Sequence, residues 1–314
     1  MIPLAEIVQA RERIAGAALR TPLVRLDADA DAEIWLKLEV LQPVRSFKLR
    51  GAGNAILQAS DAELAGGVLT ASAGNMAQGV AYAARLRGVP ATIVVPEHAP
   101  QTKIDAIERL GGRVIKVPHE RWWQTMEEHA HPGVEGLFVH PVEDEPVMAG
   151  NGTIGLEVLE DLPNPDAVVI PYGGGGLTVG IASAIRALRP DTKIFTAEPE
   201  TGAALAAALA AGHPADVDYR ASFVDGAGSR RVLDSMWPLV TPLVDAALAI
   251  PIGEAAAAVR LLAERARVIA EGAGALAAAA ALSGRAGSGK IVCIVSGGNI
   301  NLSKLADILQ GAAA

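Results

Sequence analysis

Short runs rich in β-branched residues alternate with alanine-rich stretches along most of the chain. These runs occupy Ala91 to Val95, Arg113 to Val117, Ala167 to Ile170, Lys193 to Ala197 and Lys290 to Val295. Strands of continuous apolar character that alternate with helices are typical of parallel sheets covered on both faces. The sequence therefore predicts an α/β protein with mostly parallel sheets. The sole cysteine, Cys293, lies inside the last run, and we expect it to be a buried core residue.

The strands and helices fall into two series. One series lies between about Gly67 and His140, with helices predicted over Met76 to Arg87 and Gln101 to Leu110. The other runs from Ala167 to the end of the chain, and its alanine-rich segments predict helices packed closely against a sheet. We therefore expect two sheets, although counting strands does not place the boundary between them.

Charge and composition indicate a small-molecule partner. The chain has 314 residues, 51% of them hydrophobic, and a net charge of −8 at pH 7. It contains no block of about five like charges, so it offers no basic surface for nucleic acid or an anionic membrane. The N-terminus lacks a signal-peptide pattern, and no apolar run of about 18 residues is free of Gly, Pro and charge. We expect a cytoplasmic protein.

The segment Arg45 to Ala52 places a lysine, Lys48, between two arginines. Repulsion from Arg45 and Arg50, together with any burial, would make the neutral amine of Lys48 more accessible and more nucleophilic. A Schiff-base lysine needs this property. A solvated basic helix start explains the same residues equally well.

The segment Thr70 to Gly79 predicts a strand that ends in small residues and a helix that begins at about Met76. Backbone N–H groups at the helix start, the Ser72 hydroxyl and the Asn75 amide form a cradle suited to a carboxylate. An amino-acid substrate carries such a group. Taken by itself, the loop also fits an ordinary helix N-terminus.

The segment from Ala167 to Leu188 predicts a buried strand, four consecutive glycines at Gly173 to Gly176, and a helix. Four residues without side chains let the backbone wrap closely around an anion, and the helix N-terminus behind them favours negative charge. We therefore predict a phosphate site here, since a simple turn rarely needs four glycines. Ser296 follows another buried strand and could hydrogen-bond a heteroaromatic nitrogen.

A dinucleotide-type pattern, G-x-G-x-x-G, occurs at Gly150 to Gly155. A real fingerprint of this kind follows directly on a buried strand, and an acidic residue follows it about 20 residues later. The acidic segment Glu143 to Glu145 precedes the pattern instead, and Asp166 is poorly placed to serve as the acid. We do not expect a nicotinamide cofactor.

Taken in order, four motifs resemble the threonine/serine dehydratase and serine racemase branch of the fold-type II enzymes that use pyridoxal 5′-phosphate (PLP). They are Ser-Phe-Lys-x-Arg-Gly-Ala at 46–52, Ser-x-Gly-Asn-x-Ala-Gln-Gly at 72–79, the four glycines, and Ser-Gly-Gly-Asn at 296–299. The resemblance implies two three-layer α/β/α domains with PLP in the cleft between them. It implies a large domain of residues 1–50 and 144–314, a small mobile domain of residues 51–143, no C-terminal regulatory domain, and a homodimer.

The resemblance also implies a role for each matching residue. Lys48 would hold PLP as a Schiff base and act as general base at the substrate Cα. The other cofactor-binding residues would be Phe47 against the ring, Asn75 at the 3-oxygen, Ser296 at the ring nitrogen, and Gly173, Gly174, Gly175, Gly176 and Leu177 at the phosphate. The substrate carboxylate would be gripped by Ser72, Ala73, Gly74, Asn75, Met76 and Gln78.

A neutral serine at the ring nitrogen makes PLP a weaker electron sink than a carboxylate partner would. A weak sink suits β-elimination, because departure of the hydroxyl discharges the negative charge at Cα. The resemblance thus implies dehydration and deamination of L-threonine or L-serine to a 2-oxo acid and ammonia.

Several positions depart from the family pattern. Ala73 and Met76 stand where a second serine and a histidine are usual, so racemisation should be poor and the identity of the substrate is open. Glu198 matches one ligand of the racemase cation site, but Ala204 replaces the aspartate, and we predict no metal site. The pair Trp122 and Trp123 fits either a cleft lining or core and interface packing.

Two other functions fit parts of the sequence. One is a different PLP activity: a racemase, a β-replacement enzyme, or a dehydratase of a bulkier β-hydroxy amino acid. The other is a binding protein without catalysis, in which the glycines hold a phosphorylated ligand and Lys48 is a surface charge. A yellow colour that depends on Lys48 would exclude the binding protein.

Overall fold

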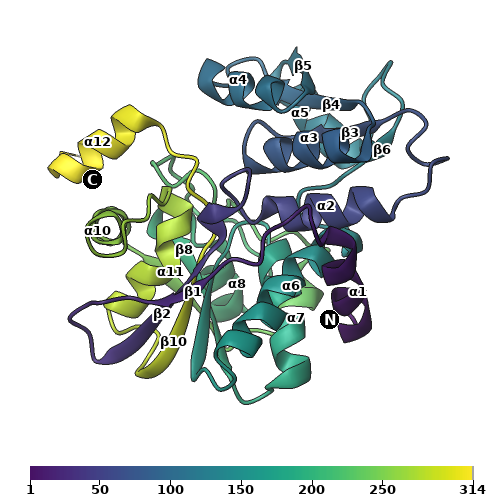
Figure 1. Ribbon diagram of the computed structural model, residues 1–314. Helices are drawn as coiled ribbons and strands as arrows, with labels where there is room; N and C mark the ends of the chain where they lie inside the picture. The colour runs from purple at the N-terminus through teal and green to yellow at the C-terminus, as the bar shows by residue number, and fades with distance from the viewer. Residues whose placement is uncertain (313–314) are drawn as a thin grey trace.

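A six-stranded sheet forms the centre of the larger of two α/β units in the computed structural model, which describes residues 1–312 (Figure 1). The strand order is β1-β2-β10-β7-β8-β9. All neighbouring strands are parallel except β1, which pairs antiparallel with β2. The strands span Leu23–Arg25 (β1), Ala32–Leu38 (β2), Ala167–Pro171 (β7), Lys193–Pro199 (β8), Ala246–Ile250 (β9) and Gly289–Val295 (β10).

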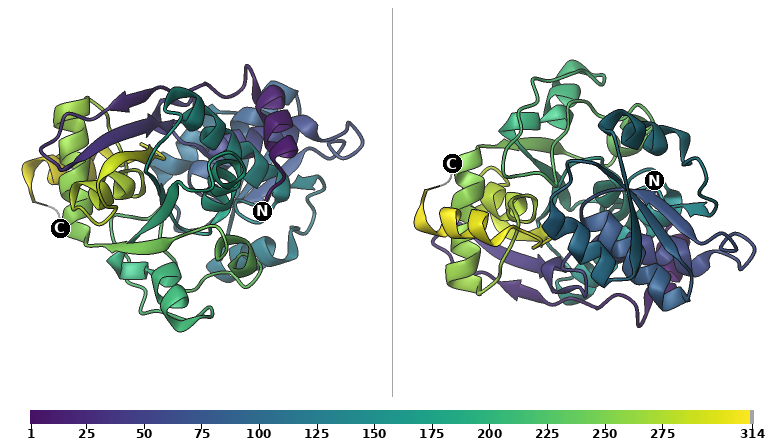
Figure 2. Two further views of the ribbon diagram at one scale, coloured as in Figure 1. Left: turned by 90° about the horizontal axis from the view of Figure 1, so that it is seen from below. Right: turned by 90° about the horizontal axis from the view of Figure 1, so that it is seen from above.

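Helices cover both faces of this sheet, because neighbouring residues on each strand point to opposite sides. On β7, Val168 and Ile170 belong to the core that includes residues of α1, α6, α7 and α8, whereas Val169 belongs to the core that includes residues of α10, α11 and α12. The two sets lie on opposite sides of the sheet when the molecule is seen from below or above (Figure 2). They are α1 (Leu4–Ile14), α6 (Glu145–Asp161), α7 (Gly176–Leu188), α8 (Ala204–Ala211), α10 (Ile252–Leu261), α11 (Gly272–Leu282) and α12 (Leu302–Gln310); short helical turns lie at Glu39–Leu41 (η1), Glu200–Gly202 (η2), Trp237–Val240 (α9) and Leu262–Ala266 (η3).

A second, four-stranded sheet forms the centre of the smaller unit, with the parallel order β5-β4-β3-β6. Helices α2, α3 and α4 pack on one face of this sheet, and α5 packs on the other. Its elements are α2 (Lys48–Gln58), β3 (Val68–Ala71), α3 (Asn75–Arg87), β4 (Ala91–Pro96), α4 (Gln101–Arg109), β5 (Gly112–Val117), α5 (His119–Glu128) and β6 (Leu137–Phe138). Two three-layer units with mostly parallel sheets therefore confirm the predicted fold class. The division at residues 51 and 143 stays a prediction.

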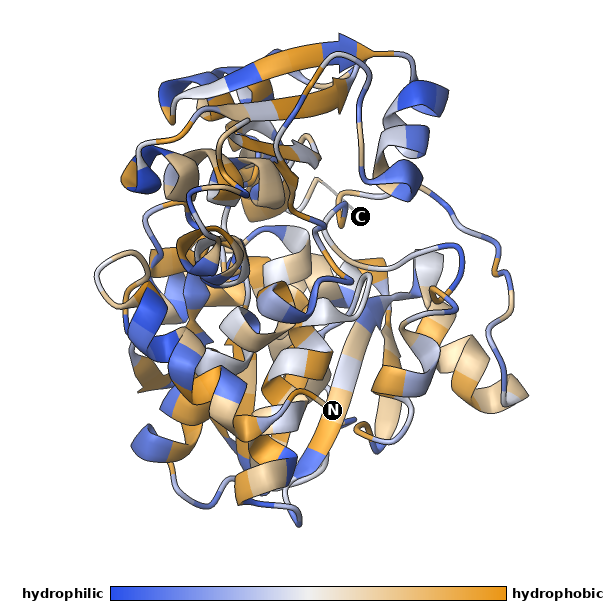
Figure 3. Cartoon of the chain, turned by 90° about the vertical axis from the view of Figure 1, so that its right-hand side faces the viewer, coloured by the Kyte–Doolittle hydropathy of each residue, from blue (hydrophilic) through white to orange (hydrophobic). Residues whose placement is uncertain are grey.

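The hydrophobic residues concentrate on the strands and on the helix faces that meet them (Figure 3). Cys293 lies fully buried on β10, and its thiol donates to the carbonyl of Ala277 on α11 at 3.3 Å. This contact confirms that the cysteine is a core residue. Within residues 1–312, no helix is both long and apolar enough to cross a bilayer.

The dinucleotide-type pattern lies inside helix α6, not in a turn after a strand. A Cβ on Gly150 would come within 2.3 Å of the Arg50 carbonyl oxygen, and one on Gly152 within 2.9 Å of the Gly180 carbonyl oxygen. These glycines let α6 approach α2 and α7 closely. The pattern therefore reflects helix packing, and it does not follow directly on a strand as a dinucleotide fingerprint does.

Candidate active site

Lys48 is the first residue of α2, and the turn before it is fastened to the end of β10. The Phe47 backbone N–H donates to the Ser296 carbonyl at 3.0 Å, and Ser46 forms a β-bridge with Gly297. Ser296 is buried directly after β10. Lys48 and Ser296 thus lie beside each other at the carboxyl end of the large sheet, where ligands of parallel α/β proteins collect.

The Lys48 amine is partly buried and held in place. Its Nζ donates to the Pro141 carbonyl oxygen at 2.7 Å and lies 5.2 Å from the centre of the Phe47 ring. Burial lowers the pKa of this amine to about 8. A substantial neutral fraction, which is the nucleophilic form, is therefore present at mildly alkaline pH.

The neighbouring arginines are not the cause of this lowered pKa, so that part of the sequence argument is wrong. Arg50 turns into the core, where its guanidinium bonds Glu39 at 2.8 Å and Glu157 at 2.7 Å. Lys37 completes this buried network with a 2.5 Å contact to Glu157. Arg45 faces solvent, where water screens its charge.

The four glycines follow β7, and the first turn of α7 begins at Gly176. Gly175 has a φ of 101°, in the left-handed region that glycine adopts readily. A Cβ on Gly174 would lie 2.4 Å from Cγ2 of Val142, and one on Gly176 would lie 2.6 Å from the Val142 carbonyl oxygen. Gly174 and Gly176 therefore have no room for side chains, and the helix N-terminus behind the loop offers backbone N–H groups to an anion. Leu177 is buried in the same first turn.

Residues 140–143 join the lysine to the glycine loop. Pro141 accepts the hydrogen bond from Lys48, while Val142 packs against Gly174 and Gly176. His140, to which the sequence analysis gave no role, orders this segment: its Nδ1 accepts from the backbone N–H of Val142 at 3.2 Å and of Glu143 at 2.8 Å. Burial lowers the pKa of His140 to about 4, so the ring is neutral near pH 7 and carries its proton on Nε2.

The predicted carboxylate loop connects β3 to α3. Ser72, Ala73, Gly74 and Asn75 are partly buried there, and the Ser72 hydroxyl accepts from the Gly74 backbone N–H at 3.2 Å. Gln78 is buried one turn into the helix.

Met76 differs from the rest of that loop. It is only 2% exposed, and its side chain packs within the core of the smaller unit. The role of Met76 as a substrate contact stays a prediction.

Glu271 is a second residue that received no role from the sequence. It directly precedes α11, and its carboxylate accepts from Nδ2 of Asn75 at 2.8 Å. Burial raises the pKa of this carboxyl to about 7. Nothing in the sequence around Glu271 indicates that Asn75 is its partner.

Glu198 caps a helix. Its two carboxylate oxygens accept from the backbone N–H groups of Leu205 and Ala206, each at 2.9 Å, and so cap α8. Within residues 1–312, His129, His140 and Glu143 bring ligand atoms within 4.8 Å of one another. The proton on Nε2 of His140 opposes coordination there. The absence of a metal site stays a prediction.

The tryptophan pair packs on the smaller unit. Trp122, on α5, packs against the core between this helix and the sheet, and its ring centroid is 5.5 Å from that of His119. Trp123 is 46% exposed. These positions favour the packing interpretation over a cleft lining.

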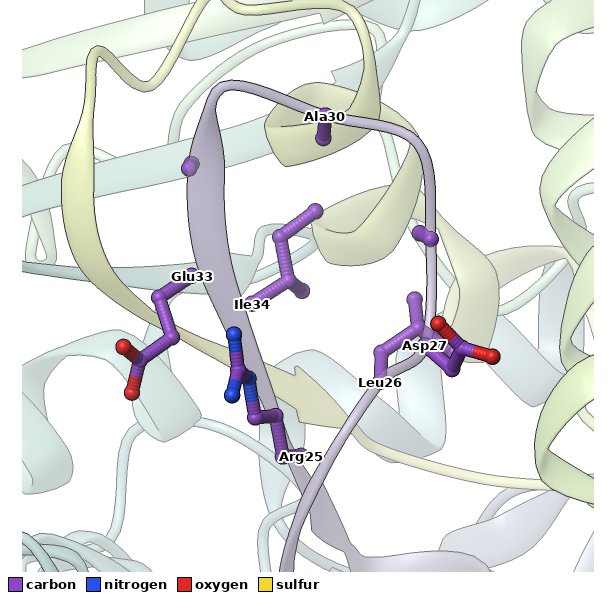
Figure 4. A pocket seen from close by; sticks show the side chains of 8 residues that line it. Arg25, Leu26, Asp27, Ala30, Glu33 and Ile34 are labelled. Atoms are coloured by element: carbon purple, nitrogen blue, oxygen red, sulfur yellow. The ribbon is translucent and has the colours of Figure 1, made fainter.

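A surface pocket of about 310 Å³ lies at the opposite end of the large sheet (Figure 4). Arg25, Asp27 and Glu33 line it. It opens near the start of β2, whereas Ser296 follows Val295, which pairs with Leu38 at the end of β2. The pocket is therefore separate from the lysine site.

A lysine with a lowered pKa, placed beside a glycine-rich anion loop at the carboxyl ends of parallel strands, defines an enzyme that binds a phosphorylated carbonyl cofactor through its amine. The comparison with protein families agrees. The chain belongs to the family of pyridoxal-phosphate dependent enzymes, which matches residues 14–297.

Individual relatives resemble the chain over nearly its whole length. An L-threonine ammonia-lyase of Thermotoga maritima is 40% identical over 317 residues, which cover 99% of this chain and 79% of that protein. Maize serine racemase superposes with a TM-score of 0.89 at 33% identity, covering 98% of this chain and 97% of that structure. The processed form of threonine deaminase isoform 2 from Solanum lycopersicum gives a TM-score of 0.86 at 33% identity and covers 99% and 94% respectively.

Proposed function

We propose that this protein is a PLP-dependent ammonia-lyase that converts L-threonine, L-serine or both to a 2-oxo acid and ammonia. The observation that carries the proposal is the position of the Lys48 amine, which donates to Pro141 beside the glycine loop and whose pKa burial lowers to about 8. The similarity to an L-threonine ammonia-lyase and to a threonine deaminase supports the choice of reaction. A homodimer and a cytoplasmic location stay predictions from the sequence.

The residues present fit the cofactor. The glycine loop has no room for a Cβ at Gly174 or Gly176, so its backbone can approach a phosphate directly. Lys48 would hold the carbonyl carbon, Ser296 would meet the ring nitrogen, and Phe47 would lie against the ring. When bound, PLP supplies an electron sink for the negative charge that develops at the substrate Cα.

Each protein group then has a defined task. The loop from Ser72 to Asn75 holds the substrate carboxylate with the Ser72 hydroxyl and the backbone N–H groups at the N-terminus of α3. The Lys48 amine takes the proton from Cα and returns it to the departing hydroxyl, which leaves as water. Addition of water to the released enamine then yields the 2-oxo acid and ammonia. The water lost in the elimination is consumed again in this step, so ammonia is the only group lost overall. Pro141 keeps the amine within reach.

A substrate panel tests the proposal. Purified protein supplied with PLP should release 2-oxo acid from L-threonine or L-serine, and much less from their D-forms and from bulkier β-hydroxy amino acids. Borohydride should bleach its visible absorption permanently, because reduction locks the lysine to the cofactor. A coloured protein that is inactive on the whole panel would retain PLP and refute the ammonia-lyase. A colourless protein that binds phosphorylated ligands would favour a non-catalytic binding protein.

Racemisation should be slow because Ala73 offers no proton donor on the cofactor face opposite Lys48. The Ala73→Ser variant should raise D-serine formation from L-serine by roughly tenfold or more, since a positioned acid or base contributes about 10²–10⁴-fold. Chiral chromatography measures this rate, and Ala73→Gly serves as the control without a hydroxyl. Equal D-serine formation by the serine and glycine variants would show that position 73 does not face the substrate Cα.

A further inference from the structure

The carboxyl group of Glu271 lies where the two units meet. It is buried, and it accepts a hydrogen bond from Asn75 of the smaller unit. On the other side, a Cβ on Gly297 of the larger unit would come within 2.4 Å of the same oxygen. The Glu271 backbone N–H also donates to the Gly297 carbonyl at 3.0 Å. The carboxyl group is therefore held on both sides beside the candidate site.

Its hydrogen bond completes a chain that orients the Asn75 side chain. Nδ2 of Asn299 donates both to the Val44 carbonyl at 2.9 Å and to Oδ1 of Asn75 at 2.8 Å. The Asn75 oxygen thus meets a donor, and its nitrogen meets the acceptor Glu271, which settles the orientation of the amide. One hydrogen of the Asn75 NH₂ group remains for a ligand.

Two charged groups act on Glu271 from opposite units. Lys103 on α4 and Asp225, next to Gly226, form an ion pair at 2.8 Å. Besides burial, which is the main cause of the raised pKa of Glu271, Asp225 raises that pKa further and Lys103 lowers it. A Cβ on Gly226 would lie 3.6 Å from the Glu271 oxygen, so this loop packs directly against the carboxyl group.

We propose that Glu271 is a positioning residue that fixes the Asn75 amide and, by gaining or losing a proton one hydrogen bond behind it, sets the protonation of the cofactor 3-oxygen. The inference rests on the PLP site proposed above, in which Asn75 meets that oxygen. An ionised Glu271 disfavours a second negative charge nearby and so favours the protonated 3-oxygen. A neutral Glu271 removes this repulsion.

The visible absorption of the PLP-loaded protein reports this protonation state. In the wild type, the absorption bands should exchange with a midpoint near pH 7, where the Glu271 carboxyl titrates. The Glu271→Gln variant cannot ionise at this position, so it should bind PLP and lose the transition. Glu271→Asp should restore a transition with a displaced midpoint, because it keeps a carboxyl group on a shorter side chain.

Glu198→Gln is the matched control. Glu198 is also a buried carboxyl group before a helix of the larger unit, and burial raises its pKa to about 7 as well. Its oxygens are engaged by the backbone of α8, so its loss should leave the spectral transition in place. A transition that persists unchanged in Glu271→Gln, or that vanishes in Glu198→Gln, overturns the inference while the PLP site stands.

The ion pair offers a test that does not alter the buried carboxyl group. Lys103→Met should raise the midpoint and Asp225→Asn should lower it, each by roughly 0.2–0.5 pH units for a solvent-exposed charge. Two shifts in the same direction, or none, would contradict the assignment to Glu271. Wild-type protein without visible absorption after PLP loading would instead refute the proposed function, and with it this inference.

Discussion

Replacing Lys48 with alanine is expected to lower kcat for the 2-oxo acid-forming reaction by at least about 10³-fold, since one side chain supplies both the cofactor anchor and the general base. The variant should also fail to retain a yellow colour through gel filtration. Lys48→Arg should be equally inactive, because a guanidinium keeps the positive charge but provides no neutral amine near pH 8. Single-turnover and steady-state assays on L-threonine measure the loss.

Lys116→Ala is the control for this experiment, since Lys116 is an exposed lysine on β5 of the smaller unit. It should retain wild-type kcat and colour. Full activity in Lys48→Ala would eliminate the proposed mechanism. Loss of activity in both variants would indicate a general effect on the fold.

The pH dependence of cofactor uptake follows from the same amine. The neutral form reacts with a carbonyl group, so uptake of PLP by the apoprotein should accelerate as pH rises and level off above about 8. Arg45→Ala should leave that midpoint in place, because burial and not the exposed arginine lowers the pKa. Stopped-flow absorbance at several pH values gives the midpoint.

The sequence predicted the parts of the molecule that depend on local pattern. The runs at Ala167 to Ile170 and Lys290 to Val295 are apolar throughout because both faces of their strands are covered, and they form β7 and β10. Strand β9, with the sequence Ala-Ala-Leu-Ala-Ile, was missed, since a strand with a single β-branched residue resembles an alanine-rich helix. The position of the glycine loop between a strand and a helix was likewise predicted, because it depends on four consecutive residues.

The site residues that were missed or misread depend on contacts between distant segments. The partner of Glu271 is Asn75, and the partners of Arg50 are Glu39 and Glu157. The direction of a side chain such as Met76 follows from the tilt of α3 on its sheet, which periodicity does not fix within one helical turn. A motif therefore indicated which residues gather, but not which partners their side chains contact.

The buried network around Arg50 should be the largest single source of instability when it is broken. Arg50→Met leaves Glu39 and Glu157 buried with only Lys37 to balance them, and removal of one partner from a buried pair costs about 3–5 kcal/mol. Burial alone would raise the pKa of Glu39, but Arg50 lowers it. The pair therefore stabilises the fold at pH values above about 4.3, the pKa of a glutamate in the unfolded chain, and this stabilisation is lost as the pH falls. Urea denaturation at pH 7 measures the loss, and the difference from wild type should shrink at acid pH.

Arg285 provides a matched comparison, because it makes a two-point contact with Glu254 at the surface. Arg285→Met should cost only about 0–1 kcal/mol, since water already screens that pair. The double variant Lys37→Met/Glu157→Gln removes one charge of each sign and should therefore cost less than Arg50→Met alone. Equal losses for Arg50→Met and Arg285→Met would mean that burial does not amplify the network. A double variant less stable than Arg50→Met would mean that packing, and not charge balance, holds the start of α2 against the large sheet.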